Sequence, residues 1–209
     1  MALAMTGERP CGYKLGYTSE VMRRQMHIDR PNFGQLTAEM DFRSGATGPL
    51  IHPRVEPEIA LRIGKDVITA PADRGALLAI VDAVFPALEI VDTRYHDYVF
   101  RYEDSVADNS SAAGFVLGEA FRPQALSSAG LAVSLASAGA EKFAGHSSAA
   151  MGDPLEALRW LCSELVQNGT MLPAGSIILT GGLTPAPFLV KGKASTAEFE
   201  QLGTVAFVW

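Results

Sequence analysis

Two glutamates, Glu56 and Glu58, stand two residues apart in a segment, residues 54–63, whose side chains alternate between apolar and polar. Strict alternation is typical of a half-buried β-strand, because successive side chains leave opposite faces of the pleat. The two carboxylates then project from one face, roughly 7 Å apart along the strand. Like charges at this spacing repel unless a cation lies between them, and a divalent cation with oxygen ligands suits the position.

A solvent-exposed strand face is the alternative interpretation of this pair, with Arg54 and Arg62 as ordinary ion partners. A third carboxylate favours the metal. Glu89 lies in the run Ala-Leu-Glu-Ile-Val, residues 87–91, which has the composition of a buried strand. A buried carboxylate carries a large desolvation cost unless it is paired or ligates a metal. Glu89 therefore strengthens the metal hypothesis.

Composition narrows the class of protein. The chain has 209 residues, of which 48% are hydrophobic and 19% charged, and this favours one globular domain over a disordered chain. A formal net charge of −6 argues against a nucleic-acid partner. The two cysteines, Cys11 and Cys162, form no disulfide framework or zinc motif, and neither a membrane span nor a signal peptide is recognisable. We expect a cytoplasmic protein without a membrane or nucleic-acid partner.

Lys14 lies in a short alternating segment, residues 12–18, among apolar neighbours. It is either a surface lysine with a buried aliphatic stem or a cation directed into a pocket, and the local sequence leaves both open. The polar cluster from Asp108 to Ser111 has the composition of a capped turn. Gly181 and Gly182 follow an apolar strand, where they allow either a tight bend or close approach of a ligand.

Helix-capping residues, glycines and prolines indicate where helices begin and end and where turns lie. Ser19 predicts a helix over residues 20–27, and residues 29–34 and 43–49 have turn and loop composition. A helix is expected from Asp73 through Val84, ended by Pro86. The other expected elements are a strand at 87–93, an ordered loop at 95–102, a short strand at the end of 105–118, a strand at 131–137, a helix from 154 to a stop at Gly169, a strand at 177–180 and a hairpin at 196–209.

Taken together, the chain resembles the fumarylacetoacetate hydrolase superfamily, and within it the 2-oxo-acid hydratases and decarboxylases of aromatic degradation pathways. The resemblance recurs in order over nearly the whole chain. It is carried by residues 12–19, 51–60, 86–94, 106–111, 152–155, 173–184 and 202–205. It implies an α+β protein with a mixed β-sandwich or roll and a few flanking helices.

The resemblance also assigns roles to residues. It implies Mg²⁺, with Mn²⁺ as the other candidate, held by Glu56, Glu58 and Glu89. The implied catalytic residues are Lys14, Asp108 and Ser111, and the implied substrate-binding residues are Asn109, Gly182 and Thr184. The substrate would be a small anionic 2-oxo acid.

Several details resemble 4-oxalocrotonate decarboxylases more than hydratases. These are Leu-Ile-His-Pro before the glutamate pair, Asp-Thr-Arg-Tyr after Glu89, Thr-Gly-Gly-Leu-Thr at residues 180–184, and Asn32, an amide that cannot act as a base, where hydratases often carry aspartate. We therefore expect decarboxylation of 2-oxo-3-hexenedioate through an enolate stabilised by the cation. The alternatives are a 2-hydroxypenta-2,4-dienoate hydratase, an acylpyruvate hydrolase or tautomerase, and an inactive subunit that partners an active enzyme.

Relatives of this kind usually carry a helical N-terminal segment before the lysine motif, whereas about a dozen residues precede it here. The expectation is a single catalytic domain over residues 1–209 with a shortened N-terminal segment. The resemblance also implies a homo-oligomer and association with a partner hydratase or decarboxylase.

Overall fold

The computed structural model describes residues 7–20, 23–24, 28–44, 48–126, 128–137 and 142–209. It contains a six-stranded sheet of order β2-β1-β8-β3-β4-β5 and a four-stranded sheet of order β10-β9-β6-β7. The first sheet comprises β1 (Pro10–Gly16), β2 (Asn32–Thr37), β3 (Arg54–Ile63), β4 (Val81–Val91), β5 (Ala112–Leu117) and β8 (Ile177–Leu179). The second comprises β6 (Ala132–Ser137), β7 (Phe143–His146), β9 (Ala194–Phe199) and β10 (Gly203–Val208).

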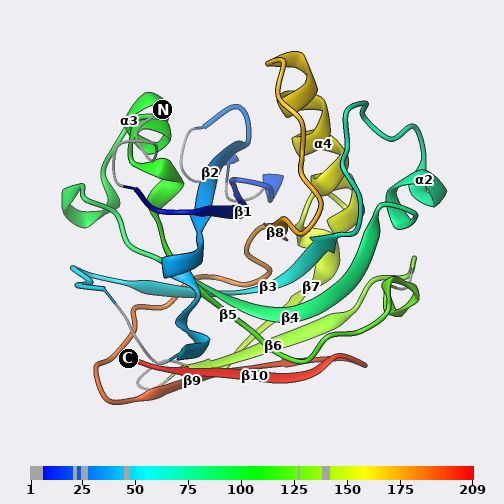
Figure 1. Cartoon of the computed structure of the whole chain (residues 1–209). Helices are drawn as coiled ribbons and strands as arrows, with labels where there is room; N and C mark the ends of the chain where they lie inside the picture. The colour runs from blue at the N-terminus through cyan, green and yellow to red at the C-terminus, as the bar shows by residue number, and fades with distance from the viewer. Residues whose placement is uncertain (1–6, 21–22, 25–27, 45–47, 127, 138–141) are drawn as a thin grey trace.

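Helices flank these sheets rather than forming a layer of their own. They are α2 (Arg74–Leu78), α3 (Tyr102–Ala107) and α4 (Pro154–Gln167). Figure 1 shows β9 and β10 below β4, with α3 and α4 above β4 at the left and right of the view. β1 pairs in parallel with β8 and antiparallel with β2, so the six-stranded sheet is mixed. The expected α+β architecture, a mixed β-sandwich or roll with a few flanking helices, is confirmed.

The six-stranded sheet is buried on both faces. Val55, Ile59 and Leu61 point from β3 into the main core, which also contains apolar side chains of α4 and the second sheet. Ala60 points the other way, into a second apolar cluster. This cluster also contains Phe85 of β4, Leu36 of β2 and Leu179 of β8. Alternation therefore assigns the two faces of β3 correctly. The expectation of a half-buried strand is wrong, since Glu58 and Ala60 have no exposed surface.

The second cluster lies inside a roll. Asp41, which follows β2, forms a parallel bridge with Phe115 of β5, so the two edges of the six-stranded sheet approach one another. The inward side chains of β3, β4 and β5 therefore face those of β1 and β2. This geometry brings Lys14 of β1 opposite the glutamates of β3 and β4.

The expected helix from Asp73 to Val84 is largely wrong. Only α2, Arg74–Leu78, is helical, with the Asp73 side chain accepting a hydrogen bond from Ala76 N at its start. Val81 and Val84 instead belong to β4, which pairs with β3 along its whole length. Pro86 lies inside β4, one residue beyond the end of the β4–β5 ladder. On that side only the Pro86 carbonyl forms a hydrogen bond, which it accepts from Gly118 N at 2.8 Å.

Residues 32–34 were expected in a turn and instead begin β2, opposite Gly16, Leu15 and Lys14 of β1. Gly34 allows the backbone at Asn109 to pack against β2, since a Cβ atom on residue 34 would overlap the carbonyl oxygen of Asn109. Of the helix expected over 20–27, Glu20, Arg23 and Arg24 are helical, and the rest lies outside the described residues. The loop expected at 43–49 likewise includes undescribed residues 45–47.

Other elements agree with expectation. α4 begins at an N-cap, Asp153, whose side chain accepts from Leu155 N at 2.9 Å, and Gly169 has a φ of 68° just after its end. β6, β8 and the β9–β10 hairpin are confirmed, whereas β7 and α3 were not anticipated. Among the described residues, no helix combines the length and apolarity needed to cross a bilayer.

Candidate metal centre and active site

Three carboxylates meet inside the roll. Glu56 of β3 lies directly opposite Glu89 of β4 in the antiparallel register, and Glu58 follows two residues along the same face. One oxygen from each of Glu56, Glu58 and Glu89 lies within 4.8 Å of the other two. Glu58 and Glu89 have no exposed surface, and Glu56 is partly exposed. The predicted trio is thus a real cluster.

Among the described residues, three of the four carboxylate oxygens of Glu58 and Glu89 accept no hydrogen bond. Glu58 Oε2 accepts a hydrogen bond from Gly181 N at 2.7 Å. Within the described part of the chain, Glu58 Oε1 and both oxygens of Glu89 accept no hydrogen bond, although Glu89 Oε1 forms an ion pair with Lys14 Nζ at 2.9 Å. Buried carboxylates left in this state are costly. A hard divalent cation takes oxygen ligands of this kind, so the donor set fits Mg²⁺ or Mn²⁺.

Burial and mutual repulsion change the protonation of the cluster. Burial and the charge of Glu89 raise the pKa of Glu56 to about 7. Burial and the carboxylates of Glu89 and Glu56 raise the pKa of Glu58 well above its usual value. A carboxylate must lose its proton to ligate a cation, so metal binding competes with protonation here.

We therefore expect metal-free protein to bind Mn²⁺ about tenfold more tightly at about pH 8 than at about pH 6. The sign follows from Glu56, whose raised pKa leaves it mostly protonated at the lower pH and mostly ionised at the higher one. Calorimetry in two buffers of different ionisation enthalpy measures both the affinity and the protons released. An affinity that stays constant between the two pH values, with no proton release, would contradict the assignment.

Lys14 is the counter-ion of the cluster. Its side chain is buried, and Nζ donates to the carbonyl oxygen of Ser110 at 3.0 Å. Burial alone would lower the pKa of Lys14, but the charges of Glu89, Glu56 and Glu58 raise it overall. The lysine is therefore a fixed ammonium directed into the pocket. Of the two alternatives for Lys14, the structure therefore supports the cation directed into a pocket over the surface lysine.

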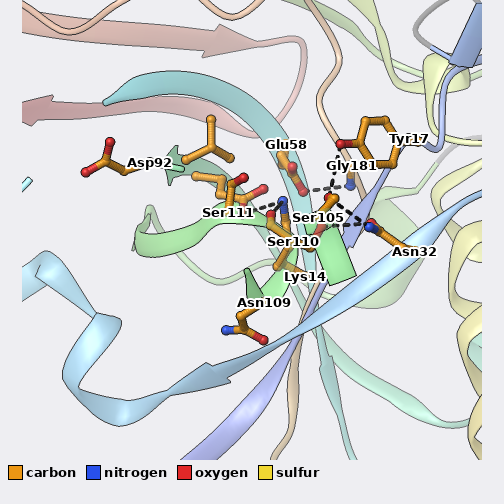
Figure 2. Close-up of polar contacts among 12 residues, drawn as sticks. Lys14, Tyr17, Asn32, Glu58, Asp92, Ser105, Asn109, Ser110, Ser111 and Gly181 are labelled. Atoms are coloured by element: carbon orange, nitrogen blue, oxygen red, sulfur yellow. Dashed lines mark hydrogen bonds and ion pairs between the residues drawn. The ribbon is translucent and has the colours of Figure 1, made fainter. Parts of the chain in front are cut away.

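The carbonyl that receives Lys14 belongs to an unusual turn. Asn109, Ser110 and Ser111 have φ values of 53°, 55° and 56°, a left-handed conformation that is costly for residues other than glycine. Ser110 Oγ donates to Asn32 Oδ1 at 2.8 Å, and Asn32 Nδ2 donates to Ser105 Oγ at 3.1 Å. Figure 2 shows this group gathered behind Lys14. The turn thus presents a carbonyl to the lysine and is anchored from β2.

Two predicted residues do not point into the cavity. The Asn109 side chain bonds to the backbone of Gln35, accepting from its N–H at 2.8 Å and donating to its carbonyl at 2.9 Å, and Figure 2 shows it directed away from Glu58. Asp108 accepts from Thr93 Oγ1 at 2.7 Å and pairs with Arg94. Both side chains hold the left-handed turn in place rather than facing a ligand.

Of the other predicted residues, all except the fully buried Glu58 and Glu89 border one cavity of about 530 Å³. Its lining includes Lys14, Glu56, Ser111, Gly182 and Thr184. A Cβ atom at Gly182 would lie 2.6 Å from Glu56 Oε2, so a side chain there would displace that carboxylate. Gly181 has a φ of 111°, which fits the tight-bend alternative for the two glycines. The group that lies close to Gly182 is a glutamate of the cluster.

Sequence reasoning missed part of the lining. Arg54, Tyr98, Phe100 and Tyr17 also border the cavity. Arg54 carried a usable signal, since it lies on the same alternating face as Glu56. Tyr98 and Phe100 lie in the segment expected as an ordered loop, residues 95–102. Nothing in the local sequence indicates which side of that loop each ring occupies.

The fold and this cluster define a class of protein. Residues 23–208 match the family model described as fumarylacetoacetate (FAA) hydrolase C-terminal. The chain belongs to this family, as the resemblance predicted. It is 38% identical to the 2-keto-4-pentenoate hydratase of Burkholderia vietnamiensis over 95% of this chain and 78% of that protein. It is also 38% identical to a 4-oxalocrotonate decarboxylase of a Pseudomonas species, over 96% of this chain and 79% of that protein.

Solved structures agree with this placement. The 4-oxalocrotonate decarboxylase of Pseudomonas putida G7, complexed with magnesium and adipate, superposes with a TM-score of 0.87 at 28% identity, covering 98% of this chain and 80% of that one. Its complex with calcium and acetate gives a TM-score of 0.84, again at 28% identity, covering 98% of this chain and 79% of that one. The fumarylpyruvate hydrolase of Pseudomonas aeruginosa shares the fold, with a TM-score of 0.72 at 16% identity. The match covers 95% of this chain and 88% of that one.

Proposed function

We propose that this protein is a metal-dependent lyase that decarboxylates a 2-oxo-enedioate such as 2-oxo-3-hexenedioate, with Mg²⁺ as its cofactor and Mn²⁺ as a substitute. Glu56, Glu58 and Glu89 hold the cation. Support comes from relatives named as lyases and from the magnesium complex of a decarboxylase of the same fold. The wall of the cavity carries the fixed charge of Lys14.

The choice of decarboxylation rests on one observation, the lack of a general base. Of the described residues that line the cavity, none is a histidine, and the acidic ones are Glu56 and Asp97. Glu56 belongs to the metal cluster, and the Asp97 side chain is largely exposed and paired with His96. Adding water to a diene needs a group that activates the water. Loss of CO₂ needs an electron sink and no base.

The chain's own residues supply the rest of the reaction. A divalent cation, when bound, acts as a Lewis acid on the 2-oxo group. The C5–C6 bond breaks, CO₂ leaves, and the electron pair moves through the conjugated chain to the C2 oxygen. Lys14 keeps its proton at Nζ and stabilises negative charge beside the cluster. Leu15, Val91 and Leu183 are apolar parts of the cavity wall that limit access of water.

The test is an assay with purified protein, Mg²⁺ and 2-oxo-3-hexenedioate, followed by absorbance with CO₂ trapped in parallel. We expect substrate loss that depends on the cation, with one CO₂ per substrate and formation of 2-hydroxypenta-2,4-dienoate. Substrate loss without CO₂, or no loss with either cation, would contradict the proposal.

A hydratase is the second candidate, because the chain is as similar to a named hydratase as to a named decarboxylase, at 38% identity each. Offering 2-hydroxypenta-2,4-dienoate to the same protein separates the two. Its cation-dependent consumption without CO₂ would assign the hydratase. It would also mean that a bound water is activated by a group other than the cavity side chains considered above.

A further inference from the structure

Arg54 lies at the wall of the active-site cavity, and none of the described residues forms an ion pair with it. Its Nε is buried and has no hydrogen-bond partner among the described residues, and its Nη1 reaches only the carbonyl of Ala186, at 3.5 Å. Arg62, on the same face of β3, forms an ion pair with Asp82 at 2.7 Å. No such pair is found for Arg54 in the described part of the chain. The interpretation of Arg54 as an ordinary surface ion partner is therefore wrong.

Two aromatic rings hold the guanidinium. Its central carbon lies 4.5 Å from the ring centroid of Tyr98 and 4.2 Å from that of Phe188. Contacts of this kind orient an arginine while leaving its N–H groups available for a ligand. Arg54 is thus fixed in place by contacts that do not neutralise its charge.

The aromatic ring of Tyr98 is itself fixed by the fold. The Tyr98 hydroxyl donates to the carbonyl of Val91 at 3.0 Å. Asp97 and Tyr98 adopt φ values of 53° and 58°, a left-handed backbone that is costly for residues other than glycine. The surrounding contacts therefore hold Tyr98 in a conformation that it would not adopt alone.

Phe188 is positioned by the start of β3. Val55 N donates to the carbonyl of Pro187 at 3.1 Å, and Leu189 N donates to that of Pro53 at 2.9 Å. This short antiparallel pairing carries Phe188 alongside Arg54. Hydrogen bonds that involve the backbone therefore fix the positions of both rings.

The charges of the site favour an anion at Arg54. With a divalent cation present, that cation and Lys14 together balance the three glutamates of the cluster. Arg54 is then the remaining positive charge among these groups. A guanidinium offers parallel N–H donors that match the two oxygens of a carboxylate.

We propose that Arg54 binds the second carboxylate of a short-chain dicarboxylic 2-oxo acid and so makes the site prefer dicarboxylates over monocarboxylates. One pleat repeat of β3, roughly 7 Å, separates Arg54 from Glu56 along the strand. A ligand whose 2-oxo acid end lies at the glutamates can therefore present its far end to the guanidinium. This inference rests on the proposed function, since it takes the glutamate cluster to bind the 2-oxo acid group.

The test compares two saturated probes of equal chain length, 2-oxoadipate and 2-oxohexanoate, which differ in the remote carboxylate and lack the double bond needed for decarboxylation. Calorimetry with Mg²⁺-loaded protein measures both dissociation constants. We expect the wild type to prefer 2-oxoadipate. In Arg54→Met, affinity for 2-oxoadipate should fall about tenfold to a hundredfold, while affinity for 2-oxohexanoate should stay within about threefold.

Controls separate recognition from folding. Arg62→Met removes an exposed arginine from the same strand face and should change neither constant. Arg54→Lys keeps the charge but loses the planar fork, so it should show a smaller loss than Arg54→Met. It also provides a folded variant if the methionine variant proves unstable, and Mg²⁺ affinity reports whether the cluster is intact.

The outcomes distinguish this proposal from the function on which it rests. An equal loss of affinity for both probes in the Arg54 variants would place Arg54 at the carboxylate next to the 2-oxo group. That result would overturn the inference and leave the lyase assignment in place. No preference in the wild type would overturn it as well. If Mg²⁺-loaded wild type binds neither probe, both the inference and the proposed function fail.

Discussion

Glu58→Gln is expected to reduce turnover by about a thousandfold or more, because the substitution removes a metal ligand from the cluster. The fold should survive. The side-chain carbonyl of the glutamine can still accept the hydrogen bond from Gly181 N. Its amide group can donate to Glu89, whereas in the wild type the two carboxylates repel one another. Thermal unfolding of metal-free protein should therefore occur at the same or a higher temperature than in the wild type.

The measurements are the rate of CO₂ release and the Mn²⁺ dissociation constant, and the matched control is Glu119→Gln, an exposed glutamate just after β5. The control should match the wild type in both. Wild-type activity and metal affinity in Glu58→Gln would remove Glu58 from the metal site.

Lys14→Met is expected to lower stability and activity while retaining the metal. The ammonium lies 2.9 Å from Glu89 in a fully buried pair, and breaking such a pair typically costs about 3–5 kcal/mol. The loss should be larger in metal-free protein, and larger above about pH 7 than below it, because the pKa of Glu56 is about 7. Activity should fall by about a hundredfold to a thousandfold, as for other fixed groups that stabilise developing charge.

Metal affinity separates this variant from Glu58→Gln, because removing a positive charge from the cluster should leave Mn²⁺ binding unchanged or tighter. Lys142→Met, which breaks an exposed pair with Glu198, is the control and should show no measurable loss. If Lys14→Met loses Mn²⁺ binding as completely as Glu58→Gln, the lysine is needed to build the metal site.

The glutamate cluster could be predicted because its signal is local. Two carboxylates at alternate positions of one strand must share a face, and this is independent of where the strand lies in the fold. Glu89 was conspicuous because its neighbours are apolar. The two strands then pair with Glu56 opposite Glu89. The position of Lys14 opposite the glutamates depends on the closure of the sheet into a roll, and the local sequence does not specify that closure.

The start of β4 could not be predicted because, apart from the exposed Asp82, it is buried on both sides. A strand between two cores loses the alternation of apolar and polar residues, and Ala76, Leu77, Ile80, Val81 and Val84 then fit a helical period as well. Pro86 strengthened that error. It is tolerated inside β4 because the ladder to β5 has already ended there.

The roles of Asn109 and Arg54 depend on backbone geometry that local sequence does not reveal. Left-handed residues turn the Asn109 side chain toward Gln35 and leave the Ser110 carbonyl facing Lys14. Arg54, like Arg62, has an apolar residue on either side. The contacts of Tyr98 and Phe188, which come from distant segments, distinguish Arg54.

The central claim is that the three glutamates hold the divalent cation of a lyase. Crystals grown with Mn²⁺ and measured at the manganese absorption edge test it most directly. We expect one anomalous peak at coordination distance, about 2.0–2.3 Å, from carboxylate oxygens of Glu56, Glu58 and Glu89. A peak at other residues, with none inside the roll, would contradict the account.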